Sequence, residues 1–322
     1  MQPHHFLTGV ELDAAELDAL LDRAIELKGA PLSSRALAGR GVALIFEKPS
    51  TRTRVSFEMG VHELGGHAVV LRSGEMQLSR GESPRDTALV LSRQVAAIAI
   101  RTGPDALVGE LARYASVPVI NMLTALHHPC QALADLMTMR ECFGSLRGLR
   151  IAYVGDGTNV ARSLAILGTI AGMDVAIASP PGYTLEDSSA LSPAEDSPVL
   201  PAGAEGSLSL YQDPYEAASG AHALYTDVWV SMGDEDTADH RRAALAPYRI
   251  DDALLDAADP AAIALHCLPA HPGEEITAEV LYGSRQRIWD QAENRRHAQK
   301  ALLELLVESP SMSATAARGQ QT

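Results

Sequence analysis

Three hydroxyl side chains and two arginines fall in five consecutive residues, Ser50 to Arg54, within the stretch FEKPSTRTRVSFE. An apolar segment precedes them and a helical pattern follows, so a predicted strand ends and a helix begins here. N–H groups at a helix start carry partial positive charge, hydroxyls donate hydrogen bonds, and a guanidinium is a planar fork that fits phosphate. The stretch therefore predicts a phosphate site. A helix cap followed by a solvated basic turn is the alternative interpretation.

Other polar residues stand at the ends of predicted strands or at the start of a helix. Arg101, Asp227 and Cys267 each follow an apolar segment, and His128 and Gln131 lie one turn apart where a long helix begins. Ligands of α/β proteins bind at the carboxyl ends of parallel strands, so these positions are candidates for a binding site. Taken singly, each also fits an ordinary role, such as a surface arginine, a helix cap or a small buried cysteine.

The elements that must position these residues alternate between strands and helices. Strands are predicted over 41–48, 67–73, 95–102, 117–123, 149–157, 174–180, 223–230 and 262–269, and helices over 8–28, 51–65, 83–94, 129–144, 159–172 and about 291–308. Apolar strands that alternate with helices are typical of parallel sheets. The pattern predicts an α/β protein with two doubly wound domains, each with a mainly parallel sheet flanked by helices.

The 322 residues fit two domains of ordinary size, joined by interdomain helices. We expect the first domain over 1–140 and the second over 141–290, with the helix at about 291–308 packing back on the first. The segment from Gly182 to Ser209 is rich in Ser, Pro, Ala and Gly, and it predicts a loop away from the site. Residues 309–322 predict a disordered tail.

Composition excludes several classes of function. The net charge is −15, which argues against a nucleic-acid partner because such partners need a basic surface. No stretch is apolar for long enough to cross a membrane. Cys130, Cys142 and Cys267 fit neither a disulfide framework nor a zinc site, which favours a reducing cytoplasm. The histidines other than His128 include no trio with metal-ligand spacing, so neither a metal nor another cofactor is expected.

A series of motifs resembles the aspartate/ornithine carbamoyltransferase family. FEKPSTRT matches the phosphate motif of that family, and further motifs follow in the family's order: QLSRGES, IRTG, HPCQALADL, GDGTNVARSL, YTDVWVSMG, LHCLPAH and DQAENRRHAQKALL. The ordered set covers about residues 5–305 and is far more specific than any one motif. The resemblance implies transfer of the carbamoyl group from carbamoyl phosphate to the δ-amine of L-ornithine. The products are L-citrulline and phosphate, in a step of arginine biosynthesis.

The resemblance also implies a carbamoyl-phosphate site in the first domain and an ornithine site in the second. For carbamoyl phosphate it implies Ser50, Thr51, Arg52, Thr53, Gln77, Arg101, His128, Gln131, Cys267, Leu268 and Arg295; for ornithine it implies Asn159, Asp227, Ser231 and Met232. Arg101 and His128, with Cys267, form the implied catalytic set. Gln77 would reach the site of a neighbouring subunit in a homotrimer.

Two points stay open from the residues. The δ-amine must lose a proton before it attacks, and either Cys267, with or without Asp227, or the phosphate of the substrate could accept that proton. The charged stretch GDEDTADHRRAALAPYR is predicted to order when ornithine binds, and a plain surface loop is the alternative.

Three other functions compete with this interpretation. YVGDGTNVA has two glycines of a dinucleotide fingerprint, but Val160 stands at the third position and Ser179 where a ribose-binding acid is needed, which argues against an oxidoreductase. A non-catalytic scaffold would not need the complete set of charged site residues. A transferase that uses putrescine, another amine or aspartate is the third alternative, against which DVWVSMG and HCLP favour ornithine. Thr158 stands where the family often has asparagine.

Overall fold

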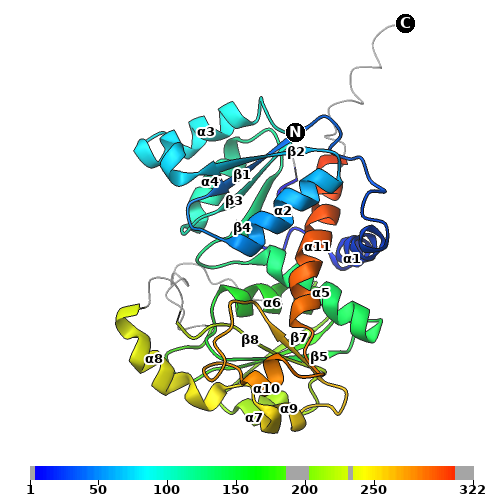
Figure 1. The fold of residues 1–322 in the computed structure, drawn as a ribbon, viewed down its shortest axis with the longest axis vertical. Coiled ribbons are helices and arrows are strands. Elements are labelled where there is room, and N and C mark those ends of the chain that lie inside the picture. The colour runs from blue at the N-terminus through cyan, green and yellow to red at the C-terminus, as the bar shows by residue number, and fades with distance from the viewer. Residues whose placement is uncertain (1–3, 186–202, 231–234, 309–322) are drawn as a thin grey trace, which may run out of the picture. The chain divides into compact units, whose positions relative to one another are not determined.

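The computed structural model describes residues 4–185, 203–230 and 235–308. The chain divides into two compact units: unit 1 comprises Met1–Glu11, Ala19–Cys130 and Arg295–Thr322, and unit 2 comprises Leu12–Asp18 and Gln131–Asn294. Each unit is built around one sheet (Figure 1). The predicted tail over 309–322 lies outside the described residues.

Unit 1 contains a four-stranded parallel sheet in the order β2-β1-β3-β4. Its strands are β1 (Gly41–Phe46), β2 (His67–Arg72), β3 (Ala97–Arg101) and β4 (Val119–Leu123). The chain moves outward from β1 to β2 and then returns past β1 to β3. The direction of winding therefore reverses between β1 and β3, and open α/β sheets bind ligands at the carboxyl ends of the strands where this reversal occurs.

Helices cover this sheet on both faces (Figure 1). They are α1 (Ala14–Gly29), α2 (Thr51–Glu63), α3 (Pro84–Leu91), α4 (Asp105–Tyr114) and α11 (Ile288–Glu308), with short 3-10 turns η1 (Ser73–Glu75) and η2 (Gln77–Arg80) after β2. Ala43, Ile45 and Ile98 pack with Val108 and Leu111 of α4. Alternate strand residues face opposite sides of a sheet, so the near-continuous apolar strands are explained by helices on both faces.

The first helix begins later than the sequence predicts. We expected it to start near Thr8 or Glu11, but it begins after Asp13. Asp13 Oδ1 accepts the N–H of Glu16 at 2.8 Å, and Glu16 Oε2 accepts the N–H of Asp13 at 3.1 Å, which makes a reciprocal capping box. The carboxylate of Glu11 instead accepts N–H groups of the preceding turn, among them that of Gly9 at 2.7 Å.

Helices α2 and α11 pack closely within unit 1. A Cβ added to Gly60 of α2 would lie 3.2 Å from Cγ of Lys300, so glycine allows the close approach. The fully buried ammonium of Lys300 donates to Glu63 Oε2 at 2.6 Å and to the carbonyls of Leu27 and Pro31. Glu63 is buried as well, so the two charges compensate each other where water is excluded.

Unit 2 contains a five-stranded parallel sheet in the order β7-β6-β5-β8-β9. Its strands are β5 (Arg150–Val154), β6 (Asp174–Ala178), β7 (Ser207–Tyr211), β8 (Ala223–Thr226) and β9 (Ile263–His266). The direction of winding reverses between β5 and β8. The prediction of a loop over all of 182–209 is wrong at β7, where serines alternate with leucines on a half-exposed edge strand. Residues 186–202 of that segment lie outside the described residues.

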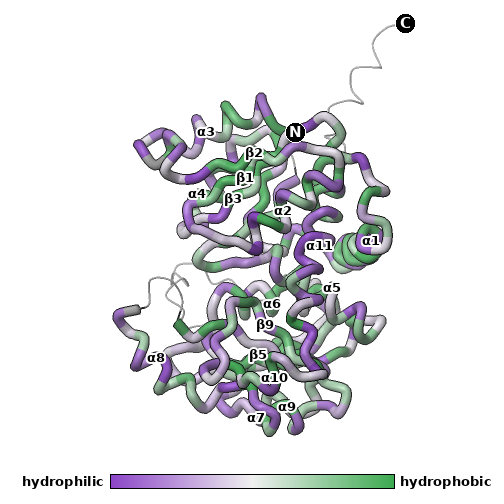
Figure 2. Tube along the Cα trace, viewed as in Figure 1, coloured by the Kyte–Doolittle hydropathy of each residue, from purple (hydrophilic) through white to green (hydrophobic). Residues whose placement is uncertain are grey.

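The helices of unit 2 are α5 (Pro129–Phe143), α6 (Asn159–Ile170), α7 (Pro214–Ala218), α8 (Ala238–Leu245), α9 (Asp252–Asp256) and α10 (Ala278–Leu281), with η3 (Glu235–Thr237) and η4 (Ala246–Tyr248) flanking α8. The unit boundary falls inside α1, after Asp18, inside α5, after Cys130, and inside α11, before Arg295. Hydrophobic residues concentrate on the strands of both sheets, whereas hydrophobic and hydrophilic residues alternate along the outer helices (Figure 2).

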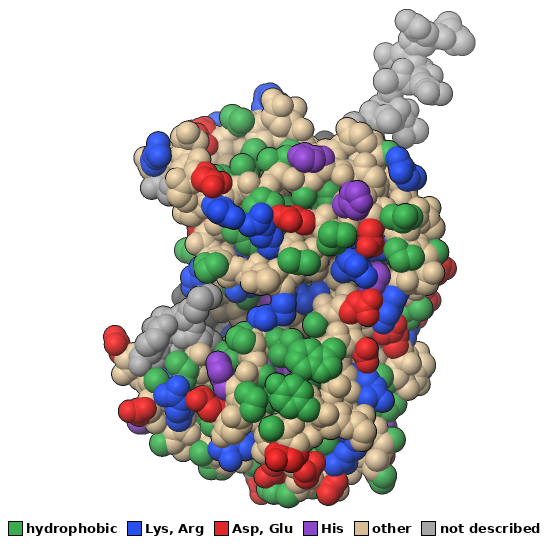
Figure 3. Space-filling view, viewed as in Figure 1, with side chains coloured by type: hydrophobic (Ala, Val, Ile, Leu, Met, Phe, Trp, Pro, Cys, Tyr) green, Lys and Arg blue, Asp and Glu red, His purple; other side chains and the backbone are tan. Residues whose placement is uncertain are grey.

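The predicted fold class is confirmed by the two parallel sheets, each flanked by helices. In the view of Figure 3, basic and acidic side chains are interspersed over the surface. Among the described residues, no helix is both long and apolar enough to cross a membrane.

Candidate functional site

The turn between β1 and α2 carries the hydroxyls and arginines that the sequence singles out. Ser50 is the N-cap of α2 in an extended conformation, and its hydroxyl accepts the N–H of Thr53 at 3.4 Å. Thr53 is fully buried, and its own hydroxyl accepts Nη2 of Arg295 at 2.7 Å. Thr51 and Arg52 open the first turn of the helix. Both predicted features, a helix cap and an adjacent cationic group, therefore occur at the same helix N-terminus.

Three guanidinium groups lie around His128 in unit 1. His128 is buried, and burial lowers the pKa of its imidazole well below the usual value; Arg295, Arg101 and Arg52 lower it further, in that order. Arg101 ends β3 and Arg52 follows β1, so two of the three come from the strands between which the winding reverses. The imidazole is neutral at pH 7, and the surrounding positive charge favours an anion.

The neighbouring arginine of the same turn differs from Arg52. Arg54 forms an exposed i,i+4 ion pair with Glu58, with 2.7 Å between Nε and Oε1. The first turn of α2 thus contains one arginine that takes part in the electrostatics of His128 and one that pairs along the helix surface. Residue type alone does not distinguish the two, whereas the motif match selects Arg52.

The remaining carbamoyl-phosphate candidates occupy varied positions. Gln131 is buried in the first turn of α5, and its amide donates to Asp135 at 2.8 Å. Gln77 is exposed in the 3-10 turn η2 after edge strand β2. Cys130, next to these motif residues, donates to the carbonyl of Asn121, and burial raises the pKa of its thiol to about 12. Cys130 is therefore a protonated structural thiol.

In unit 2, the carboxyl ends of β5 and β8 bring the ornithine candidates to one edge of the sheet. Asn159 is the first residue of α6 after β5, and Asp227 directly follows β8. Thr226 joins the two strands, because its hydroxyl donates to the carbonyl of Val154 at 2.7 Å. Ser231 and Met232 lie outside the described residues.

The pKa values of two tyrosines buried in this sheet are raised by burial and by nearby acidic groups. Burial raises the pKa of Tyr153 well above its usual value, and Asp227, Asp156 and Cys267 raise it further. Burial also raises the pKa of Tyr225, with contributions from Asp135, Cys267 and Asp227. Asp227 and Cys267 follow the neighbouring parallel strands β8 and β9, so both lie at the same edge of the sheet.

The turn after β9 holds an unusual backbone. Leu268 has φ of 62°, a conformation that residues other than glycine rarely adopt. Its N–H donates to Nδ1 of His266 at 2.8 Å, and Nε2 of His266 lies 3.1 Å from Glu275 Oε1. Because Nδ1 accepts, the neutral imidazole carries its proton on Nε2 and donates it to Glu275. This buried pair fixes the backbone on either side of Cys267, and sequence reasoning did not single it out.

Arg241 of α8 is a second residue that sequence reasoning missed. Its Nη2 pairs with Asp156 Oδ2 in the turn after β5, and its Nε donates to the carbonyl of Trp229 at 2.7 Å. The guanidinium also lies 5.2 Å above the ring of Tyr183, whose hydroxyl is 3.0 Å from Nδ1 of His240. The alternative of a plain loop after Val230 is therefore wrong for 238–248, which forms α8 and η4. Asp156 offered a signal, because it stands inside the GDG motif.

The turn after β5 has no room for the phosphates of a dinucleotide. A Cβ added to Gly157 would lie 2.6 Å from the backbone nitrogen of Leu185 and 2.9 Å from the carbonyl oxygen of Tyr183. That carbonyl accepts the N–H of Gly157 at 2.7 Å. In a dinucleotide fingerprint the second glycine lets the pyrophosphate approach this backbone. Here the protein's own chain occupies the space, which argues against the oxidoreductase alternative and places residues 183–185 beside the turn that precedes Asn159.

One group of potential metal ligands occurs in the described part of the chain. His271, Glu274 and Glu275 offer ligand atoms within 4.8 Å of one another. Glu274 pairs with Arg242 at 3.1 Å, and Glu275 accepts from His266. Both carboxylates are thus engaged by protein groups.

Comparisons with known proteins match both units. The carbamoyl-P binding domain of aspartate/ornithine carbamoyltransferases matches residues 4–141, and the Asp/Orn binding domain matches residues 147–306. The ornithine carbamoyltransferase of Parafrankia sp. (strain EAN1pec) is 51% identical over 312 residues, which are 96% of this chain and 97% of that protein. The ornithine carbamoyltransferase of Acidothermus cellulolyticus is 52% identical over 306 residues, 95% of this chain and 97% of that protein.

A solved structure agrees with these sequence matches. The ornithine carbamoyltransferase from Pyrococcus furiosus superposes with a TM-score of 0.87 at 43% identity, over 96% of this chain and 98% of that chain. The matches in sequence and in structure extend over nearly the whole length, and the chain belongs to the aspartate/ornithine carbamoyltransferase family.

Proposed function

We propose that this chain transfers the carbamoyl group of carbamoyl phosphate to the δ-amine of L-ornithine, giving L-citrulline and phosphate. The observation that carries the proposal is the group of three arginines around a buried, neutral His128 at the N-terminus of α2. Such a site suits a small phosphorylated substrate.

In this proposal Ser50, Thr51 and Arg52 hold the phosphate at the N-terminus of α2. Arg101 and His128 contact the carbamoyl oxygen. The neutral imidazole donates a hydrogen bond, and Arg101 supplies charge as the oxygen becomes negative in the transition state. Thr53 already accepts from Arg295, so its hydroxyl proton remains available for the same oxygen.

The acceptor binds in unit 2 in this proposal. The carboxylate of Asp227 pairs with the α-ammonium of ornithine, and Asn159 binds the remaining polar groups of the amino-acid head together with Ser231 and Met232. The main chain at Cys267 and Leu268 contacts the reacting groups. The δ-amine nitrogen attacks the carbamoyl carbon, a C–N bond forms, and the C–O bond to phosphate breaks with its electron pair leaving on phosphate. The proton released from the amine passes to Cys267 or to the departing phosphate.

A citrulline assay tests the proposal. The protein is supplied with carbamoyl phosphate and, side by side, ornithine, putrescine or aspartate. We expect citrulline from ornithine, with kcat/KM at least about 100-fold above that for putrescine, because a site built to pair polar groups rejects a substrate that lacks them. A greater rate with putrescine or aspartate would assign the chain to a sister activity. Absence of product with all three acceptors would favour a non-catalytic role.

We also propose that the active form is a homotrimer in which Gln77 serves a neighbouring subunit. The two edges of the unit 1 sheet support this. Phe6 covers the edge of β4, since its N–H donates to Val119 and its carbonyl accepts from Asn121. Among the described strands, β2 pairs only with β1, and four of its six residues are half-exposed. An open apolar edge is a ready template for another chain.

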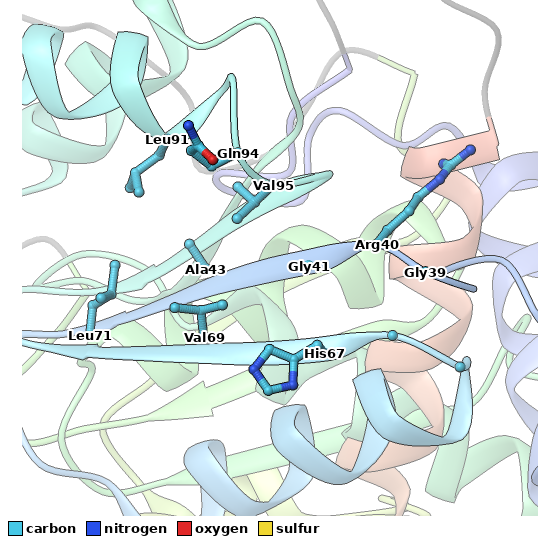
Figure 4. A pocket seen from close by; sticks show the side chains of 12 residues that line it. Gly39, Arg40, Gly41, Ala43, His67, Val69, Leu71, Leu91, Gln94 and Val95 are labelled. Carbon is cyan, nitrogen blue, oxygen red and sulfur yellow. The ribbon is translucent and has the colours of Figure 1, made fainter.

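A groove beside β2 adds to this support. It has a cavity volume of about 560 Å³, and Val69 and Leu71 of β2 face the same side as Leu91 and Val95 (Figure 4). Gly41 keeps the floor open, because an added Cβ would contact Val95 and Val69. Exposed apolar surface next to an unpaired edge is typical of a subunit interface.

Mixing two inactive variants tests the shared site. Gln77→Ala and Arg101→Ala trimers are dissociated, combined and reassembled, and citrulline formation is compared with each variant reassembled alone. We expect partial recovery, because some interfaces then combine an intact Gln77 with an intact Arg101. Mixed trimers verified by mass that recover no activity would contradict shared sites.

We infer a cytoplasmic location and a role in arginine biosynthesis. Cys142 is exposed and Cys130 and Cys267 are buried as free thiols, which fits a reducing compartment. Fractionation of the source cells tests the location, and arginine dependence of a deletion strain tests the role.

A further inference from the structure

Arg241 ties together the two strand ends between which the winding of unit 2 reverses. Its side chain is 15% exposed, and that of its partner Asp156 is 9% exposed, so the ion pair is largely removed from solvent. The same guanidinium donates from Nε to the carbonyl of Trp229 at 2.7 Å. One side chain therefore bonds to the segment after β5 and to the segment after β8.

These two anchor points flank the residues proposed to hold ornithine. Asp156 lies in the turn after β5, three residues before Asn159, and Trp229 lies two residues after Asp227. Hydrogen bonds between Arg241 and both segments limit how far Asn159 and Asp227 can move apart. Arg241 itself is not among the residues proposed to contact the substrate.

Neighbouring contacts fix the guanidinium in turn. The ring of Tyr183 lies under it at 5.2 Å, and the carbonyl of Tyr183 accepts the N–H of Gly157 at 2.7 Å. The Tyr183 hydroxyl meets Nδ1 of His240, the residue before Arg241. An arginine that stacks on a ring and donates to two separate acceptors is held in one orientation, which lysine cannot reproduce.

We infer that Arg241 is a positioning residue for the amino-acid head of the acceptor, and that it acts through Asp156 and the Trp229 carbonyl. The inference rests on the proposed function. It has an electrostatic part as well: Arg241 pairs with Asp156, and Asp156 and Asp227 both raise the pKa of Tyr153. The substrate ammonium is thereby directed to Asp227 rather than shared between two acids.

The test compares Arg241→Met with Arg242→Met. Arg242 is the next residue of α8 and is a matched control, because it pairs with Asp239 and Glu274 rather than with Asp156. We expect Arg241→Met to raise KM for ornithine at least about tenfold, since small misplacements of binding groups cost up to about 100-fold. KM for carbamoyl phosphate should stay within about twofold for both variants. Arg241→Lys should rescue little, because lysine lacks the fork.

A double-mutant cycle with Asp156→Asn separates positioning from general damage. The two single variants should raise KM for ornithine by similar factors, and the double variant should be little worse than either. Independent, multiplying effects would overturn the inference. So would an unchanged KM for ornithine in Arg241→Met, or equal rises in KM for both substrates.

A spectroscopic readout does not depend on catalysis. The chain has two tryptophans, Trp229 and Trp289, so Trp289→Phe leaves Trp229 as the sole indole reporter. Trp229 is buried, and loss of the bond to its carbonyl in Arg241→Met should shift its emission to longer wavelength, while Arg242→Met leaves it unchanged. An emission shift in a protein without citrulline formation would overturn the proposed function but keep the tie between strand ends. Unchanged emission would overturn that tie, whatever the activity.

Discussion

The two units use one topology to make two chemically different sites. In each, the winding reverses beside a central strand, and that strand is followed by a turn and a helix N-terminus: β1 and α2 in unit 1, β5 and α6 in unit 2. In unit 1 the turn carries hydroxyls and Arg52, and two more arginines lie around His128. In unit 2 the turn carries Asp156, and the backbone of residues 183–185 lies against Gly157.

This difference teaches that a helix N-terminus alone does not decide the charge of a ligand. Both helices carry the partial positive charge of a helix N-terminus, but only the turn of unit 1 adds cationic side chains. The turn of unit 2 adds a carboxylate and is covered by the protein's own chain. Topology places the strand ends, and in the proposed function a few side chains then select a phosphate in one unit and an ammonium in the other.

The largest expected effect tests the acidic side of the comparison. Asp227→Ala should lower kcat/KM for ornithine by about 100- to 1,000-fold, because a charge-assisted contact to the ammonium is lost. Calorimetry should show carbamoyl phosphate binding little changed. Weakened carbamoyl phosphate binding of the same size would mean that the charges of the two sites do not act separately.

The cationic side is tested by Arg52→Ala. We expect kcat/KM for carbamoyl phosphate to fall at least about 100-fold, since hydrogen bonds to a charged group contribute about 1.5–3 kcal/mol each and Arg52 makes more than one in the proposal. Arg54→Ala is the matched control, because Arg54 pairs with Glu58 on the helix surface and should change the rate by less than about twofold. Near-normal kinetics of Arg52→Ala would remove the phosphate assignment from the turn.

A smaller effect is expected at Cys267. Cys267→Ser should retain the fold and lose about tenfold or more in kcat, with a changed pH–rate profile, because a hydroxyl is far less acidic than a thiol. Cys142→Ser should match the unmodified protein, since Cys142 is an exposed cysteine of α5. An unchanged rate and profile in Cys267→Ser would favour the substrate phosphate as the proton acceptor.

The smallest expected effect concerns the stability of unit 1 in acid, to which two buried histidines contribute. Burial, together with Lys300 and Arg296, lowers the pKa of His297 in α11 to about 4. Because the folded-state pKa lies below the unfolded value of about 6.5, this contribution is present above pH 6.5 and is lost as the pH falls toward 4. His128 contributes in the same direction.

The free energy of unfolding should therefore fall by about 1 kcal/mol for His297 alone between pH 6.5 and 5.5. Denaturant titrations at a series of pH values measure this slope. His297→Gln should flatten it, and replacement of the exposed His62 by Gln should not. A slope that is unaffected by His297→Gln would show that the acid sensitivity comes from other groups.

Much of the fold could be predicted because the central strands are apolar on both faces. The helix starts at Ser50 and Ser83 could also be predicted, because both serines cap their helices as the sequence suggests. Edge strand β7 escaped prediction because its alternating serines and leucines resemble the loop before it. Helix α4 was overlooked, although Asp105 and Arg113 mark its first and last turns.

The candidate site divides in the same way. Residues in motifs at strand ends, such as Arg101 and Asp227, could be proposed from position and residue type. Arg241, His266 and Glu275 could not, because their roles depend on contacts between segments distant in sequence. Nothing in the letters of DHRR distinguishes Arg241 from Arg242, and only the bond to Asp156 does so.

The buried ion pair between Lys300 and Glu63 has a consequence for how the protein folds during its synthesis. The two residues are 237 positions apart, and a ribosome that adds about 5–20 residues per second takes about 10–50 s to bridge that interval. Until then the nascent unit 1 holds a carboxylate that would be buried without its ammonium. Although its sheet is translated first, unit 1 becomes complete only when the last helix leaves the exit tunnel, so chains truncated before residue 300 are expected to be clients of chaperones and proteases.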